Sequence, residues 1–202
     1  MSELNQNQQQ GINILFYASL LSNVTYDYKM HELQAPFFPE KSSYFSNLVS
    51  YYELTDYVEV DWLNQIYKLK IPVAMEKQLL QMTKNNLLNS LTPETVRAFP
   101  ISALFIAINL FGKRLGPAIY LPSSLDENSL NRLTVHLTKQ LDVLVTRYEY
   151  GIKILDIPKL FSLHTHTLPS FDTMQFMHLL NDEDYPDIYL LRNKKSKAVY
   201  AY

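Results

Sequence analysis

The clearest structural signal in this chain is the stretch SLDENSLNRLTVHLTKQLDVL, residues 124–144. Its first four residues fit a capping box, in which the serine and glutamate side chains each accept a hydrogen bond from the other residue's backbone N–H. Leucines then recur at steps of three and four residues, which places them on one face of a helix. The pattern predicts an amphipathic helix whose apolar seam is Leu130, Leu133, Leu137, Leu141 and Leu144.

Helical patterns also dominate the sequence before this stretch. Apolar spacing predicts helices over residues 43–54 and 60–69, and strong helix formers predict another over 72–91. Thr92-Pro93 begins a further helix, with threonine as N-cap and proline in the first turn. Residues 100–111 are apolar on nearly all sides, as in a central helix surrounded by protein.

Strands are expected mainly near the carboxyl end. Residues 187–191 and 198–202 alternate as strands do, whereas residues 143–157 fit a hairpin and a continued helix equally well. Residues 1–10 are rich in Asn and Gln and predict a flexible polar tail. The sequence therefore predicts an α+β, helix-dominated single domain over 11–202, with a small antiparallel β element near the C-terminus.

Composition excludes several classes of site. The 202 residues contain no cysteine and four glycines, and the net charge is −2. A disulfide framework and a cysteine nucleophile are thus excluded, and the net charge predicts no global attraction to nucleic acid or anionic lipid. No phosphate loop, dinucleotide fingerprint or nucleophile elbow is present, and no repeat occurs at the periods of solenoid proteins.

Membrane insertion is not expected. The longest apolar run, residues 99–111, falls short of the ~20 residues that a spanning helix needs. The first apolar run, residues 12–21, has no Lys or Arg before it and so lacks the basic region of an export signal. We therefore expect a cytoplasmic protein.

Tyrosine-rich and leucine-rich faces lead to the main functional hypothesis. The chain has 15 Tyr and 10 Phe, and tyrosine and tryptophan are favoured at the centres of protein interfaces. No grouping of reactive side chains forms a catalytic constellation, and no cofactor is expected. The hypothesis is a non-enzymatic adaptor or structural subunit of a larger cytoplasmic assembly, which binds other protein subunits or a second copy of itself through Tyr51, Tyr52, Trp62, Leu133, Leu137 and Leu141.

Two alternatives remain open. The first is a nucleic-acid-associated accessory protein that uses a basic turn flanked by tyrosines, although nearby acids balance its charge and nucleic acid ranks below protein as a partner. The second is a metal-dependent enzyme built on His164 and His166, with His178 close in sequence. The basic turn consists of Arg192, Lys194, Lys195 and Lys197.

Overall fold

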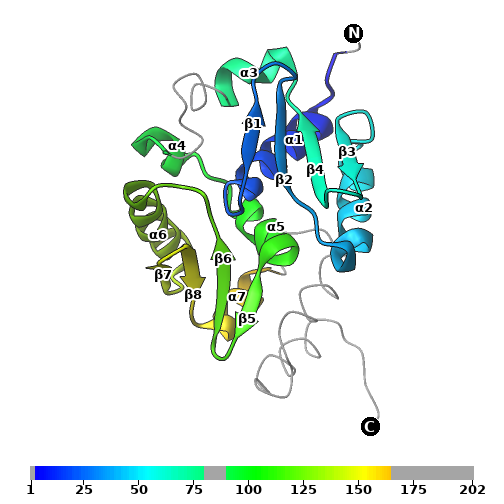
Figure 1. Ribbon diagram of the computed structural model, residues 1–202. Helices are drawn as coiled ribbons and strands as arrows, with labels where there is room; N and C mark the ends of the chain where they lie inside the picture. The colour runs from blue at the N-terminus through cyan, green and yellow to red at the C-terminus, as the bar shows by residue number, and fades with distance from the viewer. Residues whose placement is uncertain (1–2, 80–89, 165–202) are drawn as a thin grey trace.

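The computed structural model describes residues 3–79 and 90–164, which fold into two halves with the same order of elements (Figure 1). In each half a helix is followed by a β-hairpin, a second helix, a second hairpin and a third helix. In the first half these elements are α1 (Gln6–Ser19), β1 (Thr25–Asp27), β2 (Glu32–Pro36), the short 3₁₀ helix η1 (Pro39–Lys41), α2 (Ser42–Tyr51), β3 (Val58–Asp61), β4 (Ile66–Lys70) and α3 (Val73–Leu79).

The second half repeats this order after one extra short helix, α4 (Pro93–Arg97). Its two hairpins form a sheet with the strand order β5-β6-β8-β7, which corresponds strand for strand to the order β1-β2-β4-β3 of the first half. All neighbouring strands are antiparallel. The elements are α5 (Ile101–Phe111), β5 (Lys113–Leu115), β6 (Ala118–Pro122), α6 (Glu127–Leu141), β7 (Val145–Tyr148), β8 (Gly151–Ile154) and α7 (Ile157–His164).

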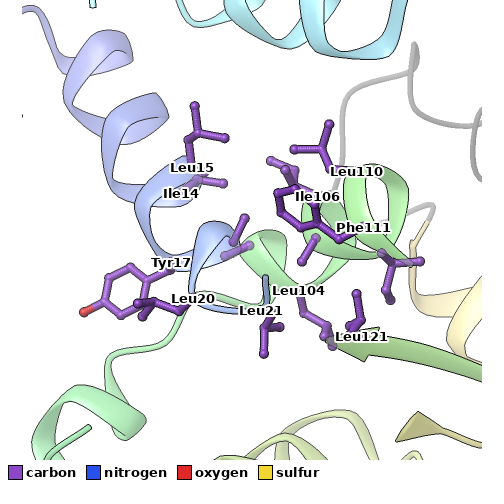
Figure 2. Packing of buried hydrophobic residues seen from close by; sticks show 14 of the residues in the cluster. Ile14, Leu15, Tyr17, Leu20, Leu21, Leu104, Ile106, Leu110, Phe111 and Leu121 are labelled. Atoms are coloured by element: carbon purple, nitrogen blue, oxygen red, sulfur yellow. The ribbon is translucent and has the colours of Figure 1, made fainter. Parts of the chain in front are cut away.

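The first helices of the two halves, α1 and α5, pack directly against each other at the centre of the molecule. Leu15 and Leu104 are fully buried there, and Figure 2 shows them among the leucines and isoleucines that fill this region. Polar contacts also join the halves, since the Ser123 hydroxyl donates to the Leu20 carbonyl at 2.6 Å and the Ser124 N–H donates to the Ser22 carbonyl at 3.2 Å. One continuous apolar core therefore serves both halves.

The expectation of a helix-dominated fold with β structure only near the C-terminus is wrong, because two four-stranded sheets span the described chain. Residues 60–69, predicted as a helix, instead form the turn between β3 and β4 and much of both strands. The Asp61 carboxylate accepts hydrogen bonds from the backbone N–H and the side-chain amide of Asn64, and Gln65 adopts a φ of 55°. These contacts favour a tight turn over helix continuation.

Several predicted helices and turns are present in the structure, and others differ from it. The amphipathic helix is confirmed as α6, although its N-cap is Asp126 and not Ser124. The helix ends at Leu141, so Leu144, which is exposed, does not belong to its apolar seam. The helices predicted after Thr92 and over 100–111 are confirmed as α4 and α5. The open choice for 143–157 is settled by the hairpin β7–β8. Within the segment expected to be a tail, α1 begins at Gln6 behind an Asn5 capping box. The expected strands at 187–191 and 198–202 lie outside the described residues.

Among the described residues, none of the helices combines the length and apolar character needed to span a lipid bilayer.

Candidate nucleic-acid interface

Each sheet has one face covered by helices and one open face. In the first sheet, called sheet A, the covered face carries Leu33, Tyr67 and Leu69, all buried, and the α2 residue Phe45 lies with its ring centroid 4.8 Å from that of Tyr67. Since side chains alternate along a strand, the intervening residues point to the open face. In the second sheet, sheet B, the covered face carries the buried residues Ile119, Leu121, Ile152 and Ile154.

The open face of sheet B has a row of side chains that crosses all four strands. Lys113 on β5 is opposite Tyr120 on β6, Tyr120 is opposite Lys153 on β8, and Lys153 is opposite Thr146 on β7. We call these four residues the middle row of sheet B. It places two ammonium groups and one aromatic ring side by side, and no acidic residue belongs to it.

An adjoining tyrosine extends this surface. The ring of Tyr148 on β7 lies edge-to-face with that of Tyr120, with a centroid separation of 5.1 Å and an interplanar angle of 81°. Burial, and then the neighbouring Tyr120, raise the pKa of the Tyr148 hydroxyl above its ordinary value. Tyr148 therefore stays neutral at physiological pH and offers an apolar ring with a polar edge.

The corresponding row of sheet A is different in charge. Counting back from the proline that ends the second strand of each sheet, the equivalent residues are Thr25, Gln34, Lys68 and Glu59. The lysine Lys68 corresponds to Lys153, but here a carboxylate opposes it across the strands. The open face of sheet A also carries Asp27, Glu32 and Asp61.

Two of these carboxylates are held in their charged form. The backbone N–H groups of Met30 and Lys29 lower the pKa of Asp27, while the side chain and backbone of Asn64 lower that of Asp61. Hydrogen bonds donated to a carboxylate favour its ionised state. The open face of sheet A is thus acidic, whereas that of sheet B is basic and aromatic.

The residues predicted from sequence lie elsewhere. Tyr51 and Trp62 are exposed by 51% and 61%, but Tyr52 is buried. The leucine seam of α6 packs into the chain's own core through Leu133, Leu137 and Leu141.

The remaining predicted residues give little further information. His164 is the last residue of α7, while His166, His178 and the basic turn Arg192, Lys194, Lys195 and Lys197 lie outside the described residues. Within the described ranges, no group of three or more His, Cys, Asp or Glu side chains could hold a metal ion.

Sequence reasoning missed the middle row of sheet B. One sign of it was available: in residues 145–154, Val145, Ile152 and Ile154 alternate with Thr146 and Lys153 as on a half-covered hairpin. The pairing of Lys113 with Tyr120 depends on the turn at Gly116, where φ is 57°. Only the register brings the four residues into one row.

Comparison with known proteins supports the fold. No family of proteins is matched by the sequence, and no curated protein is similar to it. Among solved structures, the chain is similar to the homing endonuclease I-WcaI bound to its DNA recognition sequence, with a TM-score of 0.52 and 13% identity over 94% of this chain and 87% of that one. It also matches full-length DUF199/WhiA from Thermatoga maritima, with a TM-score of 0.48 and 11% identity over 100% of this chain and 64% of that one.

The likeness to I-WcaI contradicts the hypothesis of a protein-binding adaptor. It also contradicts the low rank that we gave to nucleic acid among the expected partners. The adaptor hypothesis rested on aromatic and apolar content and on the lack of a catalytic constellation, and the low rank of nucleic acid rested on counts of charged residues. None of these quantities describes how charge is distributed between the two sheets. The nucleic-acid alternative is therefore the hypothesis to develop.

Proposed function

We propose that this chain binds nucleic acid, and that the open face of sheet B is its main contact surface. The observation that carries the proposal is the middle row of sheet B, in which Lys113, Tyr120 and Lys153 lie side by side without an acidic residue. The fold supports it, because I-WcaI, to which the chain is similar in fold, is bound to DNA in its own structure. A cytoplasmic location remains part of the proposal.

The chemistry of the row suits a phosphate backbone. Lysine ammonium groups neutralise phosphates and release counterions, which supplies much of the affinity of proteins for nucleic acid. The Tyr120 hydroxyl can donate a hydrogen bond to a phosphate or sugar oxygen, whereas the Thr146 hydroxyl oxygen is buried. Sheet B also carries two arginines, and both already have partners. Arg147 pairs with Glu127, and the Arg114 side chain donates to the Gly116 carbonyl at 3.2 Å. Lys113 and Lys153 form no ion pair with any described residue.

A double substitution tests the proposal. Lys113→Gln with Lys153→Gln should weaken binding to a fluorescently labelled DNA duplex. The negative slope of log K against log salt should become shallower by about 1 for each lysine lost. The matched control is Lys68→Gln with Lys70→Gln on the open face of sheet A, which removes the same charge and should change the slope less. Anisotropy titrations between about 50 and 200 mM salt measure both.

The outcomes separate clearly. Equal losses in the two double variants would show that only total charge matters and would contradict the assignment of the interface to sheet B. Failure of the unchanged protein to bind DNA or RNA duplexes at low salt would contradict the proposed function itself.

A further inference from the structure

A cavity of about 640 Å³ opens beside the middle row of sheet B. Its wall on one side is the open face of sheet B with the end of α5, and on the other side it is the segment 38–41 of the first half. The volume falls within the range of about 300–1,000 Å³ that is typical of small-molecule sites. Because Lys113 and Tyr120 line it, the cavity is continuous with the proposed interface.

The walls of this cavity are aromatic. Phe38, Phe111, Tyr120 and Tyr148 all line it, and Phe38 is exposed by 41% although its neighbour Phe37 is buried. An aromatic ring that faces a cavity offers a flat apolar surface on which another planar ring can stack. Phe111 is buried and stacks on Tyr67, so the more accessible rings are those of Phe38, Tyr120 and Tyr148. Three such rings around one space favour a planar, aromatic occupant.

The charges at the rim favour an anion attached to that occupant. Lys41 and Lys113 line the cavity, and neither forms an ion pair with a described residue. Burial lowers the pKa of Lys41, and the nearby Glu40 partly offsets this effect. Glu40 also lines the cavity, and its carboxylate can accept a hydrogen bond from an amino group on the edge of a base.

An aromatic ring that carries a phosphate is the chemistry of a nucleotide. A base inside a duplex has both faces covered by its neighbours, so it cannot reach aromatic walls set beside the duplex. A base that has left the stack exposes both faces, and its own phosphates remain near the rim. The cavity therefore suits an unpaired base and not a paired one.

We propose that this cavity receives one unpaired nucleobase of a strand bound along sheet B, stacked against Phe38 and the Tyr120–Tyr148 pair, with Lys41 and Lys113 on its phosphates. This inference rests on the proposed function and gives it a substrate preference. The protein recognises nucleic acid in which a base is displaced from the helix, such as a bulge or a junction.

Three DNA duplexes of otherwise identical sequence test the inference: one fully paired, one with a single-nucleotide bulge and one in which the bulged residue is abasic. The full chain should bind the bulged duplex about 5- to 150-fold more tightly than the abasic one, which corresponds to stacking of one base. Phe38→Leu should reduce this ratio at least several-fold. Tyr51→Leu, which removes another exposed aromatic ring that does not line the cavity, should leave it unchanged.

Each result has one meaning. Equal affinity for the bulged and abasic duplexes, with measurable binding to the paired duplex, overturns the inference and leaves the proposed function standing. A preference that survives Phe38→Leu, in a variant whose circular dichroism and melting curve match those of the unchanged chain, overturns the placement of the base in this cavity. Competition by free mononucleotide that is as effective as the bulged strand would assign the cavity to a small ligand and also overturn the inference. No binding to any of the three DNA duplexes overturns this inference, and it contradicts the proposed function as well when RNA duplexes are not bound either.

Discussion

The two halves of the chain share a fold and differ in surface. Strand order, the position of the central helix and the proline at the end of the second strand, Pro36 or Pro122, are the same in both. The middle row of sheet B and the corresponding row of sheet A share a lysine, Lys153 or Lys68. The other residues of the row are neutral or acidic in sheet A, whereas in sheet B they are a lysine, a tyrosine and a threonine. The covered faces are alike because both pack into the common core, whereas the open faces differ in charge.

The largest expected effect concerns the core that the halves share. Leu104 on α5 is fully buried where the helix meets α1, so Leu104→Ala should cost about 2–5 kcal/mol of unfolding free energy through lost contacts and a cavity. Trp62, the one tryptophan of the sequence, belongs to the first half. Its fluorescence in a urea titration should report this loss, although the substitution lies in the second half. A fluorescence transition unchanged by Leu104→Ala would mean that the halves unfold independently.

A glycine in sheet B provides the second test. Gly151 is opposite Pro122, and a Cβ added to it would lie 2.0 Å from the Leu121 carbonyl oxygen. Gly151→Ala should therefore destabilise the pairing of β6 with β8 by about 1–3 kcal/mol. The equivalent residue in sheet A is Ile66, opposite Pro36, where Ile66→Ala introduces no such clash. Thermal melts that show the larger loss for Ile66→Ala would contradict this account of the two ladders.

A third experiment gives the row of sheet A the same charge as the middle row of sheet B. Thr25→Lys with Glu59→Gln gives the row of sheet A two lysines and no acid, as in the middle row of sheet B. If bound nucleic acid reaches sheet A, the slope of log K against log salt should steepen by about 1 from the added lysine. A slope equal to that of the unchanged chain would confine the interface to sheet B. Both substituted positions lie on the open face, so the melting temperature should change little. Measuring it is the control for folding.

The smallest effect is expected just after the second helix of each half. Asp142 follows α6 in the left-handed conformation, with φ of 51°, as Glu53 does near the end of α2, with φ of 56°. Asp142→Gly relieves the backbone strain but loses the contact with Lys159, so the melting temperature at neutral pH should hardly change.

Acid should reveal the two opposing contributions at Asp142. The hydrogen bond and charge of Lys159 lower the pKa of Asp142, so the stabilisation from this pair is present above the ordinary carboxyl pKa of about 4 and is lost as the pH falls through the lowered value. The variant should therefore gain in melting temperature relative to the unchanged chain as the pH falls. A difference that stays constant with pH would contradict the role of the pair.

Sequence reasoning succeeded where one local pattern determined the structure. The leucine spacing of α6 and the all-round apolar character of α5 each predict a helix, because helix propensity and the expected burial agree in both segments. It failed at residues 60–69, where Trp62 and Ile66 have helical spacing while Tyr67 and Leu69 alternate as in a strand. The contacts that decide the outcome come from β2, which is distant in sequence, so a local pattern could not resolve the choice.

The candidate site was hidden for a related reason. Lys113, Tyr120 and Lys153 are spread over forty residues of sequence and form no motif, and only cross-strand register places them together. The correspondence between the two halves was hidden as well, because it is one of strand and element order and not of a repeated sequence pattern. The net charge of the chain is small because an acidic open face on sheet A offsets a basic one on sheet B. For this reason the net charge led to a low rank for nucleic acid among the expected partners.

The joining of both halves in a single polypeptide has a consequence for what the molecule can recognise. In a symmetric dimer any substitution appears twice, so both copies present the same surface and the preferred target tends to be a palindrome. Here each half is encoded separately and can change alone, as the difference between Glu59 and Thr146 illustrates. Under the proposed function, such a polypeptide is suited to a nucleic acid without internal symmetry, bound mainly at one end.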